Sequence, residues 1–117
     1  MKKLLLLTAS LVFSVGAWAD CGDPASFAEE IGCLTAEANA LKKQLNKTYA
    51  KLYAQVDAKK ELENAQKAWL RYRDLQCGDF TLAEAGANSS QMAFDAACQI
   101  SLLKSRIDYL SEITTPD

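Results

Sequence analysis

Four cysteines, Cys21, Cys33, Cys77 and Cys98, constrain the fold of this 117-residue chain more than any other feature. An even number of cysteines in a small exported domain is typical of a disulfide framework. The chain has no histidine and no C-x-x-C pair, and its wide cysteine spacing does not fit a four-cysteine zinc site in an oxidising compartment. The pattern therefore predicts two disulfides, no metal and no cofactor.

The first nineteen residues have the composition of an export signal. Two lysines are followed by an almost wholly apolar run over residues 4–15 and by an A-x-A cleavage site that ends at Ala19. The run is too short to span a bilayer comfortably. Asp20, just before the first cysteine, does not fit a lipid-attachment site. We predict a signal peptide over residues 1–19, a domain over residues 20–117, a periplasmic or secreted location and no membrane anchor.

The net charge of the exported domain narrows the classes of partner. Without the two lysines of the leader, the 13 basic residues fall to 11 against 15 acidic residues, so the net charge is −4. This charge argues against nucleic acid and anionic membranes as partners, and it permits a basic protein partner.

A long first helix is predicted to begin after Ser26 and to run for about thirty residues, because residues 36–60 contain neither Gly nor Pro. Ser26 and Glu29 have the spacing of a capping box, and Asp57 is the expected N-cap of the next helix. Alternating steps of four and three define a heptad-like apolar seam. Its members are Phe27, Ile31, Leu34, Ala38, Leu41, Leu45, Thr48 and Leu52.

Two further helices complete the expected all-α fold, a small three-helix bundle held by two disulfides. A bend near residues 56–59 precedes the second helix, which is predicted to end near Cys77 with Gly78 as its C-cap. An irregular loop over residues 78–90 leads to a last helix over residues 90–113. The apolar stripe of that last helix comprises Met92, Ala96, Ile100, Leu103, Ile107 and Leu110.

The second helix carries the densest segment, AQKAWLRYRDLQC over residues 65–77. One of its faces is predicted to enter the core and holds Leu62, Ala65, Trp69 and Tyr72. Arg71 and Asp74 are three apart and could pair on another side of the helix. Arg106 of the last helix is expected to face Asp74 and to fix the register of the two helices. The segment therefore indicates a core helix.

The predicted helices favour one pairing of the cysteines over its alternatives. A polar lead folded back on the first helix would join Cys21 to Cys33, and a second bridge from Cys77 to Cys98 would close the hairpin around the loop. Each bridge is worth about 3 kcal/mol by the chain-entropy estimate. The pairing of Cys21 with Cys77 and Cys33 with Cys98 is the main rival.

Several motifs spread over the exported domain together resemble a known family. They are the block over residues 65–74 followed by Cys77, the segment LNKTY over residues 45–49, Cys33 with the helix after it, and Cys98 with Arg106 and Leu110. The chain resembles the lysozyme inhibitor LprI-like family of small exported bacterial proteins. The residues that carry the motif are Gln66, Trp69, Tyr72, Arg73, Asp74 and Arg106. The resemblance implies a helical, disulfide-bonded periplasmic or surface protein, and lysozyme as its partner.

Chemistry-bearing residues argue for a binding protein and against an enzyme. No histidine is present as a base, the cysteines are expected to be oxidised, and no carboxylate pair converges on a pocket. The loop between Cys77 and Cys98 is the best candidate for a partner-binding surface, through Asp79, Phe80, Glu84 and Asn88. Alternatively, Asp79 and Glu84 are ordinary solvent-exposed charges of the loop, and Phe80 packs beneath the loop. A structural or envelope-interaction protein with no enzyme target remains the alternative function.

Overall fold

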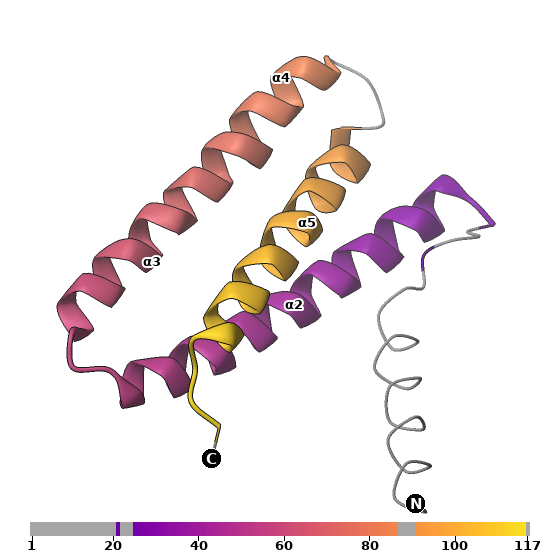
Figure 1. The fold of residues 1–117 in the computed structure, drawn as a ribbon. Helices are drawn as coiled ribbons and strands as arrows, with labels where there is room; N and C mark the ends of the chain where they lie inside the picture. Colours follow the sequence, from indigo (N-terminus) through magenta and orange to yellow (C-terminus); the bar gives the residue numbers. More distant parts are fainter. Residues whose placement is uncertain (1–20, 22–24, 87–90, 117) are drawn as a thin grey trace, which may run out of the picture.

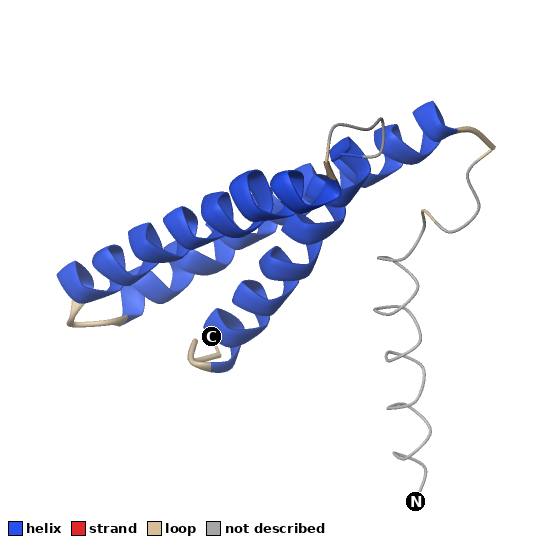
Figure 2. Cartoon of the chain, turned by 90° about the horizontal axis from the view of Figure 1, so that it is seen from above, coloured by secondary structure: helices blue, strands red, loops and turns tan. Residues whose placement is uncertain are grey.

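The structure, a computed structural model, describes residues 21, 25–86 and 91–116. The described segments are helical apart from short connections, as Figure 2 shows, and contain no strand. The elements are α2 (Phe27–Gln55), α3 (Lys59–Arg73), the π-helical segment η1 (Asp74–Thr81), α4 (Leu82–Ala85) and α5 (Gln91–Glu112). Because α3, η1 and α4 follow one another without a break, they form one helical rod. The predicted all-α fold of three helices is confirmed, whereas the predicted signal peptide lies outside the described residues.

Local sequence signals set both ends of α2. At its start the Ser26 hydroxyl accepts a hydrogen bond from the Glu29 amide at 3.1 Å, and the Glu29 carboxylate accepts one from the Ala25 amide. Ser26 thus caps the helix as predicted, although Glu29 accepts its return hydrogen bond from the Ala25 amide, one residue before the N-cap. The helix ends where Val56 adopts an extended conformation, within the predicted bend.

The cap of α3 differs from the prediction. Ala58, not Asp57, occupies the N-cap position, and no side chain caps the helix. The bend is held instead by Lys59, whose amide donates to the Asp57 carbonyl at 2.9 Å and whose ammonium donates to the Val56 carbonyl at 2.6 Å. The chain therefore reverses direction without the carboxylate cap that its sequence suggests.

The core lies along the line where α2 meets α5. Figure 1 shows the two helices running in the same general direction, with the rod returning on the other side of α5. At their C-terminal ends, the Gln55 side chain exchanges two hydrogen bonds with the backbone of Thr115, at 2.8 and 2.9 Å. The buried side chains come from both predicted apolar stripes, namely Ala38, Leu41, Leu45, Leu52, Ile100, Leu103, Ile107 and Leu110. Burial of this seam is the main source of stability available to the domain.

The rod does not end near Cys77 as predicted. The chain continues as the wider helix η1 and then as α4, and it stops at Gly86, which has a φ of 75°. Gly86 adopts a conformation that disfavours other residues, so it is the glycine that ends the rod, and Gly78 is an ordinary helical position. The Thr81 hydroxyl donates to the Gln76 carbonyl at 2.8 Å and so satisfies an acceptor within the widened turns.

The inward face of the rod is shifted by one residue from the predicted one. Leu62 and Trp69 pack against the core as expected, but Ala65 is exposed and Tyr72 is 50% exposed. The positions that do turn inward are Leu62, Gln66, Trp69, Arg73 and Cys77. Apolar periodicity predicted that Ala65 and Tyr72 face the core. In the structure the polar residues that follow them, Gln66 and Arg73, turn inward instead. The rod therefore meets α5 through polar and covalent contacts as well as apolar ones.

Truncating a buried leucine of the α2–α5 seam should destabilise the domain strongly. Leu103 is fully buried, so Leu103→Ala removes apolar contacts and leaves a cavity, at a cost of about 2–5 kcal/mol in the free energy of unfolding. Leu75→Ala is the matched control, because Leu75 is exposed and its truncation should change that free energy by less than about 0.5 kcal/mol. Urea denaturation followed by circular dichroism measures both. Equal losses would contradict the described core.

Candidate protein-binding surface

The end of the molecule farthest along the rod is a closed helical hairpin. We call it the hairpin tip and define it as residues 74–86 together with residues 91–99. A disulfide joins Cys77 of η1 to Cys98 of α5 with a Cα–Cα distance of 5.5 Å, and Cys77 is only 1% exposed. The tip is therefore held by a buried covalent link.

A side-chain amide provides a second closure of the tip. The Gln91 amide nitrogen donates to the Leu82 carbonyl at 3.1 Å and to the Gly86 carbonyl. The Leu82 carbonyl lies in the last turn of the rod and also accepts a hydrogen bond from the Gly86 amide at 3.2 Å, whereas Gly86 is the C-cap of α4. The start of α5 is thereby fixed against the end of α4.

The second disulfide lies at the start of α2. Cys21 is bonded to Cys33 with a Cα–Cα distance of 5.7 Å, which ties the polar lead to the first turns of α2. Both pairings are the ones that the helix layout favoured, so the rival pairing of Cys21 with Cys77 and Cys33 with Cys98 is wrong.

The candidate partner-binding residues lie on helix and not in a loop. Asp79 and Phe80 are exposed on η1, and Glu84 is exposed on α4. Asn88 lies outside the described residues. The prediction of an irregular loop over residues 78–90 is wrong for residues 78–85, which are helical. The π-helical turns of η1 continue the rod past Gly78, the residue that was expected to end it. The three described candidates therefore sit on a rigid scaffold.

Phe80 is exposed and does not tuck under the tip. It is 57% exposed, and Phe94 of α5 is 49% exposed. The two rings line a largely apolar hollow of about 360 Å³, whose remaining walls are Thr81, Glu84 and Ala85. Neighbouring exposed aromatic side chains around a hollow are typical of a protein-interaction surface.

Phe94 was not among the residues that the sequence pattern singled out. The signal for it is nevertheless present, because Phe94 is apolar but lies two positions from Ala96 of the buried stripe. Two helical positions correspond to a rotation of about 200°, so an aromatic residue there points away from the core. The exposure of Phe94 therefore follows from the helical periodicity of the buried stripe.

Every charged side chain of the tip is acidic. From Asp74 to Leu103 the sequence contains Asp74, Asp79, Glu84 and Asp95 but no Lys or Arg. Asp74 forms an ion pair with the preceding Arg73 at 3.4 Å. The predicted partners of Asp74 were Arg71 and Arg106. Such an exposed pair contributes little to stability. The exposed charges of the tip are therefore negative, and Asp79 and Glu84 are among them.

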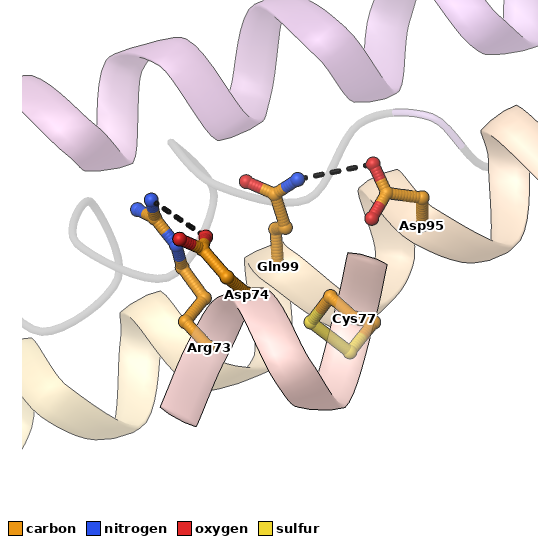
Figure 3. A network of polar contacts seen from close by, with 6 residues as sticks. Arg73, Asp74, Cys77, Asp95 and Gln99 are labelled. Atoms are coloured by element: carbon orange, nitrogen blue, oxygen red, sulfur yellow. Dashed lines mark hydrogen bonds and ion pairs between the residues drawn. A yellow bond between two sulfur atoms is a disulfide. The ribbon is translucent and has the colours of Figure 1, made fainter. Parts of the chain in front are cut away.

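Figure 3 shows that the acidic contacts stay within their own helices. The Arg73–Asp74 pair lies on the segment that carries Cys77, and the Gln99 amide donates to the Asp95 carboxylate on α5 at 3.0 Å. The other Asp95 oxygen is buried and has no hydrogen-bond donor among the residues that the structure describes.

The motif residues form a structural contact between the rod and α5. The Arg106 Nε donates to the Gln66 side-chain oxygen at 3.0 Å, and Gln66 is itself buried. The Arg106 guanidinium lies 5.9 Å from the centre of the Trp69 ring and 6.0 Å from that of Tyr109. Arg106 thus bonds Gln66 in place of the expected Asp74.

Arg106 stays cationic although burial lowers its pKa. Burial lowers the pKa of the guanidinium from its usual value, and the neighbouring Tyr109 and Tyr49 act in the opposite direction. An arginine stays protonated throughout the ordinary pH range, so the hydrogen bond to Gln66 and the attraction to the ring of Trp69 both persist. A second guanidinium, that of Arg73, lies 5.8 Å from the same Trp69 ring. Gln66, Trp69 and Arg106 of the motif thus hold the rod against α5, whereas Tyr72 and Asp74 are exposed.

The described residues offer no arrangement suited to metal chemistry or membrane insertion. Within residues 21, 25–86 and 91–116, no three cysteine or acidic side chains gather so that they could hold a metal ion. In the same ranges, no helix has the length and apolarity needed to cross a bilayer. What the tip offers is an exposed acidic and aromatic surface on a fixed scaffold.

A comparison with protein families decides where the chain belongs. Residues 21–110 match the family described as lysozyme inhibitor LprI, which covers both disulfides, the motif and the tip. This chain belongs to the LprI family. No curated protein and no solved structure gave a match. Membership in LprI, a family of inhibitors, indicates a function in binding protein and agrees with the expectation that the chain is not an enzyme.

Replacing Arg106 by lysine should weaken the link between the rod and α5. Arg106→Lys keeps the charge but removes the Nε donor to Gln66 and the planar group beside Trp69. We expect the free energy of unfolding to fall by about 1–3 kcal/mol, the range for a hydrogen bond to a charged group. Arg71→Lys is the control, since Arg71 is exposed and should tolerate the change. Denaturant unfolding that gave both variants the same stability would contradict this role of Arg106.

Proposed function

We propose that the chain inhibits lysozyme by direct protein–protein contact and that the hairpin tip is the contact surface. The observation that carries the proposal is the coincidence, on one pinned scaffold, of exclusively acidic charge and two exposed aromatic rings. The matched family is described as lysozyme inhibitor, which supports lysozyme as the target. The tip supplies the surface that would contact it.

Electrostatics favour this surface over the rest of the molecule. Animal lysozymes are strongly basic proteins whose cleft holds two carboxylates. Asp79 and Glu84 are exposed and would accelerate encounter with a basic surface. The same carboxylates would be repelled by those of the cleft, so we place them on the basic rim. Phe80 and Phe94, which carry no charge, are the side chains suited to the opening of the cleft.

The rigidity of the tip supports a tight contact. Association costs free energy when loops and side chains must be ordered, and a surface that is already fixed avoids part of this cost. The Cys77–Cys98 disulfide and the two Gln91 hydrogen bonds fix the backbone on both sides of Phe80 and Phe94. The wide exposure of both rings leaves apolar area for a partner to bury.

The arginines of the motif are less suited to binding the cleft carboxylates. Arg73 lies beside Trp69, is paired with Asp74 and is largely buried, with a side-chain exposure of 19%. Arg106 is engaged with Gln66 and Trp69. A partner would have to break these contacts before either guanidinium could serve it. This leaves the tip as the better candidate.

Lysis of bacterial cell walls by lysozyme, followed by turbidity, tests the proposal directly. The purified chain, with both disulfides formed, should slow lysis in proportion to its molar excess. Absence of any slowing at large excess over several lysozyme types would contradict inhibition. In that event the alternative of a structural envelope protein would gain weight, since Phe27, at the start of the predicted α2 seam, is 45% exposed and available to a second copy.

Neutralising the acids of the tip should slow association with lysozyme. Asp79→Asn with Glu84→Gln removes two exposed charges from the proposed surface, and we expect the association rate at low salt to fall by about tenfold. Asp108→Asn with Glu112→Gln changes the net charge by the same amount at two exposed sites outside the tip. Stopped-flow binding or surface plasmon resonance separates the variants. Equal losses would show that only total charge matters.

Truncating the exposed ring of the tip should weaken the complex once it has formed. Phe80→Ala removes apolar area from the hollow, and we expect affinity for lysozyme to fall by at least about tenfold, mainly through faster dissociation. Phe27→Ala is the matched control, because Phe27 is a similarly exposed phenylalanine at the start of α2. Dissociation rates that are unchanged in Phe80→Ala would remove this ring from the proposed interface.

A further inference from the structure

The hollow of the hairpin tip combines apolar walls with one carboxylate. Its two rings are Phe80 and Phe94, and Thr81, Glu84 and Ala85 complete the walls around a volume of about 360 Å³. Phe80 and Glu84 are four positions apart on the rod, so they stand on the same side of it, about one turn apart. Phe94 belongs to α5, the other arm of the hairpin. The hollow therefore offers apolar contact and a single negative charge to a ligand that enters it.

No cation within the described part of the chain neutralises Glu84. The described ion pairs are Arg73–Asp74 and Lys104–Glu37, and neither involves Glu84. Between Arg73 and Lys104 the sequence contains no Lys and no Arg, so no such residue lies nearby along the chain. Glu84 is exposed, and its charge is directed to solvent. A ligand with a positive group could therefore bind this carboxylate without displacing an ion pair.

We propose that the hollow receives one arginine side chain from the surface of the protein partner. The methylene stem of arginine is apolar and can pack along the rings of Phe80 and Phe94. Its guanidinium is always cationic, stacks on aromatic rings and forms paired hydrogen bonds with a carboxylate. Glu84 supplies that carboxylate. One side chain thus satisfies both kinds of wall.

Other side chains match only part of the hollow. An apolar side chain would cover the rings, but it would remove water from the Glu84 carboxylate without giving it a partner. An acidic side chain or a phosphate group would be repelled by Glu84 and by the nearby Asp79. Lysine carries a compact, strongly hydrated charge without the planar face of a guanidinium, so it gains less from the two rings.

The size of the hollow suits one side chain of a folded partner. Pockets that enclose drug-sized molecules span about 300–1,000 Å³, and this open hollow lies at the lower end of that range. Arginine is among the residues that most often dominate the binding energy at the centre of protein interfaces. The fitting partner is therefore a protein that projects an arginine from its surface.

This inference takes its partner from the proposed function and adds the residue type that is recognised. A basic lysozyme would insert an arginine of its rim into the hollow, while the outer parts of Phe80 and Phe94 contact the area around it. Asp79 does not line the hollow, so its contribution would be limited to steering the approach. The preference for arginine is a property of this chain alone, so it can be measured without lysozyme.

Nuclear magnetic resonance titration of the full oxidised chain, isotopically labelled, tests this preference. The probes are capped Gly-Arg-Gly, Gly-Lys-Gly and Gly-citrulline-Gly, titrated to about 50 mM because a single side chain binds weakly. The arginine peptide should shift the backbone amides of residues 80–85 and 94. The citrulline peptide, which has a similar shape without the charge, should leave them in place. The lysine peptide, which matches charge and ionic strength, should bind about threefold more weakly.

Variants of the walls assign the binding to the hollow. Glu84→Gln should weaken binding of the arginine peptide by about fivefold, the upper range for an exposed ion pair. Phe94→Ala should weaken it by about threefold, as expected for loss of one ring beside an exposed cation. Glu112→Gln is the matched control, because it removes one carboxylate from an exposed site on α5 outside the tip.

Three outcomes would overturn the inference. They are absence of shifts at residues 80–85 and 94, equal shifts with the arginine and citrulline peptides, and equal affinity of Glu84→Gln and Glu112→Gln for the arginine peptide. Binding of the arginine peptide by a chain that does not slow lysozyme would support the hollow and remove the proposed function. Inhibition of lysozyme by a chain that does not bind the peptide would do the reverse.

Discussion

The fold depends on the packing of α5, which serves both sides of the molecule. Its apolar stripe fills the seam of α2, while its other contacts hold the rod through the Cys77–Cys98 disulfide and the Arg106–Gln66 hydrogen bond. A domain of this size buries only a modest core, so covalent and charge-assisted links carry a larger share of its stability than they would in a larger protein. The position of the tip depends on these two links, because they are the main contacts that hold the rod against α5.

Local rules predicted the parts of the fold that are decided locally. The capping box at Ser26, the seam of α2 and the stripe of α5 each follow from spacing alone, and the bend near Val56 follows from the length of rod that a small domain can bury. The prediction failed where tertiary contacts overrule composition. Gln66 and Arg73 face inward because Arg106 and the ring of Trp69 receive them there, which apolar patterning cannot anticipate.

The helix end and the candidate surface show the same limit. Gly78 suggested a stop, yet the wider turns of η1 accommodate it, and Gly86 ends the rod with a positive φ. Asp79, Phe80 and Glu84 were singled out by position near a disulfide, and they do lie exposed there, although on helix. Phe94 came from a distant part of the chain to complete the hollow. A hollow between two helices depends on their relative placement, which no single segment encodes.

The helical form of the tip has a consequence for how long such a protein survives in the presence of proteases. Exposed irregular loops are the preferred sites of nicking by proteases, because they can be drawn into an extended conformation. Between Asp74 and Ala85 the backbone is instead held in helical turns, and Cys77 anchors it to α5. A protease would have to unwind this stretch before cutting it, while the disulfide resists that unwinding. The proposed contact segment is thus shielded from digestion by its own secondary structure.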